Sequence, residues 1–534
     1  MTQPGHVDAV VVGAGIAGLY ALHRLTEAGL TVQGFEAGDG VGGTWYWNRY
    51  PGARCDVESV DYSYSFDDDL QQQWDWTERY AAQPELLRYL EHVADRFDLR
   101  RHIAFGTRVD AASFDAATGR WTVQTDAGTT TAQFLVLAVG CLSAAQVPDF
   151  PGLETFRGEV LHTGQWPAEG VDLAGRRVGV IGTGSSAIQA IPVIAEQAEQ
   201  LVVFQRTPNY SVPAGNRPLS PDELAEVKAG YAEHRRRARN TFFGFAFPLS
   251  ELSSRPALEV PAADRDREFQ ARWDRGGAGM TRAFADILTD RQANETAAEF
   301  IRSKIRATVT DPGTAELLVP VDHPFGTKRP PIDTNYYESF NRDNVTLVDV
   351  RSDPIVEVVP SGVRTGAASH DLDVLVLATG FDAMTGPLLR MDIRGVGGRE
   401  LRDKWAAGPV TYLGLATEGF PNMFVVAGAG SPSVMSNMVV SIEQHVDWIV
   451  ACLQHLRSEG HTLIEACADA EQAWVEHVNA TAARTLYPEA NSWYLGANVP
   501  GKPRVFMPYV GGIVDYRQRC EDVAARGYAG FRSS

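Results

Sequence analysis

The sequence predicts an α/β protein built from two Rossmann-like dinucleotide-binding domains, with a helical insertion in the second domain. Two glycine-rich loops, Gly13–Gly18 and Gly182–Ala187, each follow a short apolar run and open a stretch of helical spacing. Strand, glycine turn and helix in that order form the unit that binds a dinucleotide. After the second unit, helical spacing replaces strand patterns, and this indicates the insertion.

The first unit begins with a continuous apolar run at residues 8–12, which is typical of a buried parallel strand. Behind the loop, apolar residues recur at every third position and predict a helix: Ile16, Leu19, Leu22 and Leu25. Gly29 can end this helix, and a second strand follows at residues 31–35. The unit therefore has every element that the dinucleotide-binding pattern requires.

Each part of that pattern has a physical reason in this chain. Gly13 permits the tight turn, Gly15 lets the backbone approach a pyrophosphate, and Gly18 lets the helix pack closely. The helix N-terminus then faces the phosphates. Glu36, at the end of the second strand, can accept hydrogen bonds from a ribose. We expect this acidic unit to bind FAD.

The second unit differs from the first at the ribose position. Its loop residues are Gly182, Thr183, Gly184, Ser185, Ser186 and Ala187. The following strand, residues 201–204, ends in Gln205, Arg206 and Thr207 instead of an acid. A carboxylate there would repel a 2′-phosphate, whereas an arginine pairs with it. The second unit therefore predicts NADPH rather than NADH, and the alternative is that Arg206 is a solvated loop residue.

Element patterns divide the chain into five segments. Residues 134–140 and 374–380 are apolar runs that end in small residues and glycine, which suits chain crossings between two nucleotide domains, although either could be an ordinary core strand. Ser220 begins a capping box, and Ala297, Ile301 and Ile305 recur at helical spacing. We expect an FAD-binding domain at 1–143 and 383–534, an NADPH-binding domain at 144–215 and 323–382, and the helical insertion at 216–322.

Composition excludes several classes of protein. A formal charge of -19 argues against a nucleic-acid partner, and the basic run Arg235–Arg237 with Arg239 reads as a solvated helix face. No signal sequence or apolar span is visible, so we expect a cytoplasmic protein without a membrane partner. The cysteines are scattered and never in C-x-x-C spacing: Cys55, Cys141, Cys452, Cys467 and Cys520. We expect no disulfide framework, no metal site and no flavin disulfide reductase.

The segment between the two units, Phe156–Pro167, narrows the interpretation. It fits F-x-G-x-x-x-H-x-x-x-W-P and resembles the fingerprint of the type I Baeyer–Villiger monooxygenases, which use FAD and NADPH. Taken singly, His162 and Trp166 read as interface packing. The resemblance implies that the segment couples domain movement to catalysis and that His162 transfers no proton.

The resemblance extends over nearly the whole chain. Four further segments are similar to the family: residues 42–56, 204–208, 324–329 and 491–498. Residues 430–438 resemble the longer active-site loop of phenylacetone and steroid monooxygenases. Ala429 stands where these relatives usually have proline, which leaves open the rigidity of this loop and the substrate range.

The resemblance implies that one oxygen of O2 is inserted beside a ketone carbonyl to give an ester or lactone, through a flavin peroxide on NADPH-reduced FAD. Arginine keeps its charge and donates no proton to such an anion. Arg329 is therefore the expected stabiliser of the peroxide, held by an ion pair with Asp56, which also contacts the flavin. Lys328 would point the other way, toward the phosphate beside Arg206. From composition alone, Lys328 and Arg329 would be a solvated turn and Asp56 a surface carboxylate.

The same resemblance assigns further contacts. On the FAD side they are Thr44, Trp45, Val57, Tyr62, Val109 and Met438. Trp493 would lie over the NADP ribose, and a core tryptophan is the competing interpretation. For Cys141 we expect a small buried residue in the pocket wall.

Three functions are compared. Oxygenation of a ketone (aryl, cyclic or steroid) leads. A flavin monooxygenase that acts on nitrogen or sulfur is the alternative, because a protonated peroxide attacks soft heteroatoms. A non-catalytic FAD/NADPH redox sensor ranks last, because both cofactor sites and the arginine loop are complete.

Overall fold

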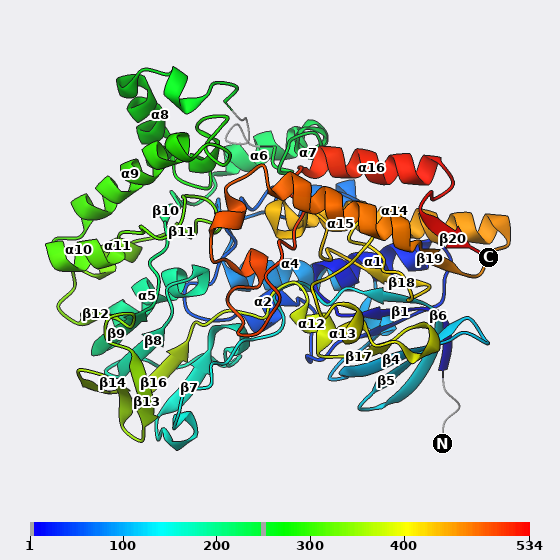
Figure 1. Ribbon diagram of the computed structural model, residues 1–534, viewed down its shortest axis with the longest axis horizontal. Helices are drawn as coiled ribbons and strands as arrows, with labels where there is room; N and C mark the ends of the chain where they lie inside the picture. The colour runs from blue at the N-terminus through cyan, green and yellow to red at the C-terminus, as the bar shows by residue number, and fades with distance from the viewer. Residues whose placement is uncertain (1–4, 247–252) are drawn as a thin grey trace.

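The structure, a computed structural model, describes residues 5–246 and 253–534. Two sheets that contain parallel strands lie in separate lobes, and helices cover them (Figure 1). The first sheet has eight strands, with β18 paired to β6 beside the main path. In sheet order its strands are β17 (Asp392–Arg394), β4 (Val109–Asp115), β5 (Arg120–Thr125), β6 (Gly128–Leu137), β1 (Gly5–Val12), β2 (Val32–Phe35) and β3 (Ile103–Ala104), with β18 (Met423–Val425).

The first glycine loop joins β1 to α1 (Ile16–Glu27), as the sequence predicts. Gly13 has a φ of 103°, and a Cβ at this position would lie 2.6 Å from the carbonyl oxygen of Ala138, just past β6. Only glycine fits there, because a side chain would be strained and would collide with backbone. Gly29, with a φ of 78°, follows the helix end.

The second sheet repeats this arrangement with five parallel strands. In order they are β12 (Val345–Asp349), β9 (Gln200–Gln205), β8 (Arg177–Ile181), β16 (Val374–Leu377) and β7 (Glu159–His162). The loop after β8 opens α5 (Ser185–Gln197), and a Cβ on Gly182 would collide with the carbonyl oxygen of Ala378, just past β16. The two strands that were expected to end alike, β6 and β16, therefore support the glycine turns of the two units in the same way.

After β16 the chain returns to the first sheet through β17 and β18. Three long helices follow, α14 (Met438–Glu459), α15 (Ala468–Ala482) and α16 (Ile513–Ala525), and Figure 1 shows them on the side of the first sheet. The phenol of Tyr20 on α1 donates a 2.8 Å hydrogen bond to Asp447 on α14. The C-terminal helices thus complete the core around α1.

The regular elements described between residues 216 and 322 are helical. They are α6 (Pro221–Ala229), α7 (Tyr231–Arg239), α8 (Ala262–Arg275), α9 (Arg291–Thr308) and α10 (Pro312–Leu318), with short 3-10 turns. The capping box is confirmed, because the Ser220 side chain accepts from the Glu223 backbone N–H and the Glu223 side chain accepts from that of Ser220.

The expectation of a solvated basic face on α7 is wrong for Arg235. This side chain is buried, and its guanidinium donates to Gln71 (2.8 Å) and Ser63 (2.7 Å) from the first nucleotide unit. It also lies 5.0 Å from the Tyr231 ring centroid. Hydrogen-bond acceptors that are distant in sequence offset the cost of burying this charge. The local run of arginines does not reveal these acceptors.

Shorter elements complete the chain. The helices are α2 (Thr44–Trp47), α3 (Asp68–Gln73), α4 (Gln83–Arg96), α11 (Tyr336–Ser339), α12 (Gly386–Leu389) and α13 (Leu401–Lys404). The strands are β10 (Val212–Pro213), β11 (Ile332–Asp333), β13 (Ile355–Val359), β14 (Gly362–Thr365), β15 (Ser369–Asp371), β19 (Ile464–Ala466) and β20 (Phe531–Ser533).

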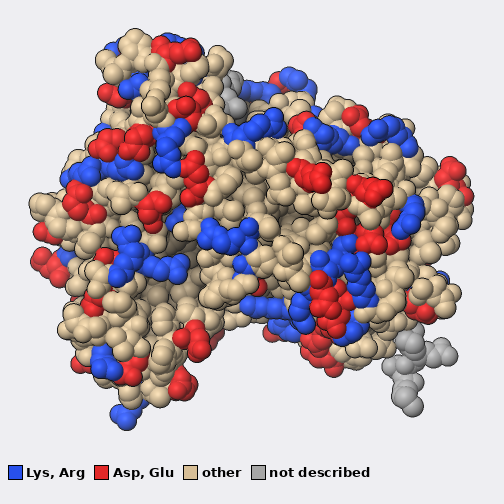
Figure 2. Space-filling model, in the orientation of Figure 1, with Lys and Arg blue, Asp and Glu red and all other residues tan. Residues whose placement is uncertain are grey.

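Within residues 5–246 and 253–534, no helix combines the length and the apolar character needed to cross a bilayer. Figure 2 shows a hollow near the middle of one face, with lysine and arginine side chains on its rim.

Candidate functional site

An arginine–carboxylate pair joins two segments that lie far apart in sequence. Arg329 Nε lies 2.5 Å from Asp56 Oδ2, and Arg329 Nη2 lies 2.9 Å from Asp56 Oδ1. Its Nη1 donates to the Val434 carbonyl oxygen at 2.8 Å. Burial lowers the pKa of Arg329, but the Asp56 carboxylate outweighs burial and raises it above the ordinary value. The expected ion pair is thus present, and the guanidinium is charged at every physiological pH.

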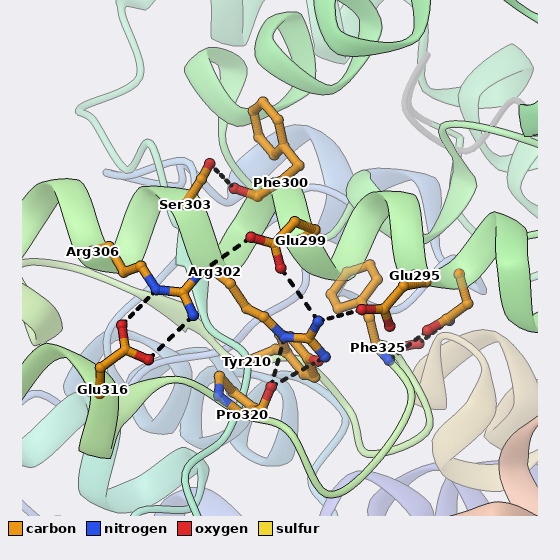
Figure 3. A network of polar contacts seen from close by, with 11 residues as sticks. Tyr210, Glu295, Glu299, Phe300, Arg302, Ser303, Arg306, Glu316, Pro320 and Phe325 are labelled. Carbon is orange, nitrogen blue, oxygen red and sulfur yellow. Dashed lines mark hydrogen bonds and ion pairs between the residues drawn. The ribbon is translucent and has the colours of Figure 1, made fainter. Parts of the chain in front are cut away.

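The loop that carries Arg329 is anchored to α9. The Asn294 side chain donates to the Phe325 carbonyl oxygen (2.8 Å) and accepts from its N–H (2.9 Å). Arg302 donates to the Pro320 carbonyl oxygen (2.8 Å) and to the Tyr210 hydroxyl (2.9 Å), and Figure 3 shows these contacts converging on one guanidinium. The helical insertion therefore fixes the backbone from which Arg329 projects.

A cavity of about 750 Å³, part of it open solvent, lies in front of the Arg329–Asp56 pair. Aromatic and aliphatic side chains make up most of its wall. Besides the pair, the lining residues are Val212, Phe243, Phe245, Ala278, Met280, Thr281, Arg282, Leu288, Phe325, Gly326, Pro330, Ile332, Val434, Met435, Ser436, Tyr487 and Tyr494. A largely apolar wall with a few charged groups is typical of a small-molecule site.

The first nucleotide unit fits a dinucleotide. No side chain caps the N-terminus of α1, so its first N–H groups are available to a pyrophosphate. A Cβ on Gly15 would lie 3.3 Å from Gly43 Cα, which means that two backbones approach closely here. Glu36 is buried and accepts from the N–H groups of Ala14 and Gly38, both at 2.8 Å. Burial raises its pKa, and the two N–H groups oppose this shift.

The other residues expected on the FAD side lie around this unit. Thr44 begins α2 and is exposed, whereas Trp45 is buried with its ring edge-on to Tyr62, at 5.9 Å between centroids. Val57 is buried and directly follows Asp56 in the sequence, and Met438 is the first residue of α14. Val109 begins β4, and the nearby Thr107 N–H donates to the Glu36 carbonyl oxygen at 2.8 Å.

The second nucleotide unit also leaves its helix N-terminus open. No side chain caps α5, and a Cβ on Gly184 would meet nothing within 4 Å. Arg206 is exposed at the end of β9, and the Thr183 hydroxyl donates to the Thr207 carbonyl oxygen at 2.8 Å. Space beside glycine and unpaired N–H groups fit a phosphate.

Lys328 and Arg329 have different surroundings although they are neighbours in the chain. Burial lowers the pKa of Lys328, Asp322 raises it and the charge of Arg206 lowers it further. Lys328 therefore lies within electrostatic reach of Arg206, whereas Arg329 pairs with Asp56. Two cations so placed would both attract an anion between them.

One helix of the second nucleotide unit, α5, packs on a loop of the first. Gln189 on α5 accepts from the Tyr50 hydroxyl at 2.8 Å and donates to the Arg54 carbonyl oxygen at 3.1 Å. A Cβ on Gly52 would collide with the Gln189 carbonyl oxygen. Residues 42–56 of the first unit thus pack directly on the helix of the second.

The segment Phe156–Pro167 forms β7, the edge of the second sheet, and the turn behind it. His162 Nδ1 accepts from the Gly164 N–H at 2.9 Å, and burial lowers the pKa of the imidazole. A Cβ on Gly164 would meet the Phe381 ring at 2.6 Å. Thr163 lies 3.1 Å, between hydroxyl oxygens, from Ser186 in the second glycine loop. These contacts indicate a packing role for the segment beside the nucleotide loop.

Sequence reasoning missed several residues of the cavity wall, above all Arg282, Tyr487 and Tyr494. Tyr494 lay inside a family-like segment, next to Trp493, and their rings are 4.3 Å apart. The others carry no local motif. Cys141 is buried, and burial raises its pKa to about 11, which rules out a reactive thiolate at neutral pH.

The active-site loop is held at several points. The carbonyl oxygen of Ala429 accepts from the Thr411 hydroxyl at 2.7 Å, and Asn437 caps α14 while donating to the Asp61 carbonyl oxygen at 2.7 Å. Ser433 has a φ of 41°, which is strained for a residue with a side chain.

Comparison with known proteins agrees with this geometry. The profile of the flavin-binding monooxygenase-like family matches residues 7–213. A Baeyer–Villiger monooxygenase of Pseudooceanicola batsensis is 47% identical over 98% of this chain and 95% of that protein. An acetone monooxygenase (methyl acetate-forming) of Gordonia sp. is 44% identical over 99% of each. The structure of oxidised steroid monooxygenase bound to NADP is 55% identical, with a TM-score of 0.94 over 99% of both chains.

Similarity of this extent covers both glycine loops, the linker segment and the arginine loop together. The chain belongs to the flavin-binding monooxygenase-like family and, within it, to the Baeyer–Villiger monooxygenases.

Proposed function

We propose that this protein oxidises a ketone to an ester or lactone with O2 and NADPH, using bound FAD. One oxygen atom enters the product, the other leaves as water, and NADPH supplies the two electrons. The observation that carries the proposal is the Arg329–Asp56 pair at the wall of a largely apolar cavity. Aryl, cyclic and steroid ketones are the substrate classes that we expect to fit it.

Bound FAD, once reduced by NADPH, supplies the activation of O2. The residues of the first unit would hold it, with the pyrophosphate at the N-terminus of α1 and a ribose at Glu36. Those of the second unit would hold NADPH, with the 2′-phosphate between Arg206 and Lys328. These assignments follow from the open helix ends and from the acid and base at the ends of β2 and β9.

Arg329 stabilises negative charge on oxygen in the cavity. A guanidinium has five N–H groups, and three of those in Arg329 donate to Asp56 and Val434. Among the described residues the remaining two have no acceptor, so they can donate to a developing oxyanion. Because arginine does not release its proton, Arg329 would leave an anion held against it unprotonated, which is the condition for oxygenation at a carbonyl carbon. Asp56 orients the guanidinium and keeps it charged.

The test is oxygenation under 18O2 of a panel that contains acetophenone, cyclohexanone and progesterone, with NADPH and FAD. Mass spectrometry should find one labelled oxygen in the ester or lactone. Thioanisole in the same panel tests the heteroatom alternative, and faster sulfoxidation than any ketone turnover would favour it. Hydrogen peroxide as the sole product of NADPH oxidation across the panel would overturn the proposal.

A further inference from the structure

A second arginine lines the cavity, and no carboxylate within residues 5–246 and 253–534 forms an ion pair with it. Arg282 lies on the 3-10 turn Met280–Arg282 of the insertion, and only 7% of the residue is exposed. Its Nε is buried without a hydrogen-bond partner, and no side chain or carbonyl among the described residues accepts from its guanidinium. Arg329 on the same wall pairs with the Asp56 carboxylate. The two arginines of this cavity therefore differ, because only Arg329 has its charge neutralised by a described carboxylate.

Aromatic rings hold Arg282 in place. The guanidinium carbon lies 4.2 Å from the Phe243 ring centroid and 5.0 Å from that of Phe245. Such stacking stabilises a cation and leaves its N–H edge free for an acceptor. The segment with these phenylalanines is itself fixed, since the Phe243 carbonyl oxygen accepts from the N–H of Asn437, at the N-terminus of α14, at 2.8 Å.

Arg282 keeps its positive charge in this environment. Burial lowers its pKa, the charge of Arg329 lowers it further, and the result is about 10. The group is still cationic at neutral pH. The carboxylate that opposes this lowering of the pKa, Asp61, already pairs with His234 at 2.8 Å. An unpaired buried cation costs free energy unless a ligand supplies the missing anion.

We propose that Arg282 anchors a carboxylate of the substrate, and therefore that this enzyme prefers oxo acids, ketones that bear a carboxylate away from the reacting carbonyl. A carboxylate fits because its two oxygens match the forked donors of a guanidinium. Arg329 acts at the reacting carbonyl and Arg282 at the acid end. This inference rests on the proposed ketone oxygenation and specifies its substrate class.

The experiment compares 5-oxohexanoate with its methyl ester, which differ in the charge at one end. For the intact enzyme, kcat/KM should favour the acid, and in Arg282→Met this acid-to-ester ratio should fall by about 10- to 100-fold, the range of a charge-assisted hydrogen bond. Arg282→Lys, which restores the charge, should recover part of it. Arg267→Met, on the exposed side of α8, is the matched control and should keep the original ratio.

Binding gives a readout that needs no turnover. Hexanoate, which has the carboxylate but no ketone, should raise the Tm of the FAD-loaded enzyme and not that of Arg282→Met. Without ligand, Arg282→Met should melt no lower than the intact enzyme, because the variant loses an unpaired buried charge.

An unchanged acid-to-ester ratio in Arg282→Met, or an equal Tm rise with hexanoate in both proteins, would overturn the proposal. If no ketone is oxygenated while hexanoate still discriminates the two proteins, the ketone function fails and the anion site stands. A rise in KM for NADPH without a change in the ratio would assign Arg282 to the cofactor instead.

Discussion

Replacing Arg329 by alanine tests the chemistry most directly. In the structure this side chain makes three hydrogen bonds to Asp56 and Val434 and keeps two N–H groups for the cavity. Removing a single preorganised oxyanion donor costs about 10²- to 10³-fold in kcat. Because Arg329 offers two donors and a full charge, we expect ester formation to fall by at least about 10²-fold.

The variant should still be reduced by NADPH, so its electrons should appear as hydrogen peroxide. The assay measures NADPH oxidation, peroxide and ester in the same reaction. Stability should fall moderately, by about 2 kcal/mol, between the values for exposed and buried ion pairs, because the side chains of Arg329 and Asp56 are 31% and 29% exposed.

Arg267→Ala, which removes an arginine that is 75% exposed, is the control. It should change neither the proportion of ester to hydrogen peroxide nor the stability. Ester formation by Arg329→Ala within tenfold of the intact enzyme would refute the role assigned to this residue.

Three further predictions follow from other parts of the structure. Arg206→Ala should raise the KM for NADPH by about 10- to 100-fold and leave NADH kinetics unchanged; equal effects on both would exclude a 2′-phosphate contact. Gly182→Ala should destabilise the fold, because the φ of Gly182 is 116° and the new methyl group would collide with the Ala378 carbonyl oxygen. Gly184→Ala should fold normally and weaken NADPH binding, because a Cβ there meets nothing within 4 Å. Equal melting temperatures for the two variants would contradict this prediction. His445 has its pKa lowered by burial to about 3, so the unfolded chain takes up a proton that the folded chain refuses. The contribution of His445 to the free energy of unfolding should be fully present above pH 6.5 and should fall below that pH by up to about 1.4 kcal/mol per pH unit. Urea titrations at several pH values measure this slope. It should be smaller in His445→Gln and unchanged in the exposed His6→Gln.

Much of the fold was predictable because its signals are local. A positive φ at Gly13 and at Gly182 is a property of one residue and its turn, and periodicity reports whether the flanking segments are strands or helices. Glu36 and Arg206 differ at equivalent strand ends, and that difference can be seen once the two strands are aligned. The family resemblance then brought residues 324–329 into the site, which composition would have left in a solvated turn.

The site itself depends on contacts between distant segments. Asp56 and Arg329 are separated by 273 positions, and their carbonyl partner at Val434 lies another 105 positions on. The distances within this cluster, and the raised pKa of Arg329 that the Asp56 carboxylate causes against burial, follow from tertiary packing, which a local pattern does not encode.

Arginine shows this limit most clearly. Arg235 sits in a basic run that resembles a solvated face, yet Gln71 and Ser63 from the first nucleotide unit accept its hydrogen bonds. Arg282 has no motif around it, and only packing of the insertion against the active-site loop places it on the cavity wall. The two nucleotide units and their order were predictable from turns and periodicity, which are local signals, and the family was predictable from its resemblance at Phe156–Pro167. Tertiary structure decided which cations are neutralised and which face the substrate cavity, because the energy of a buried charge depends on partners that only folding brings near.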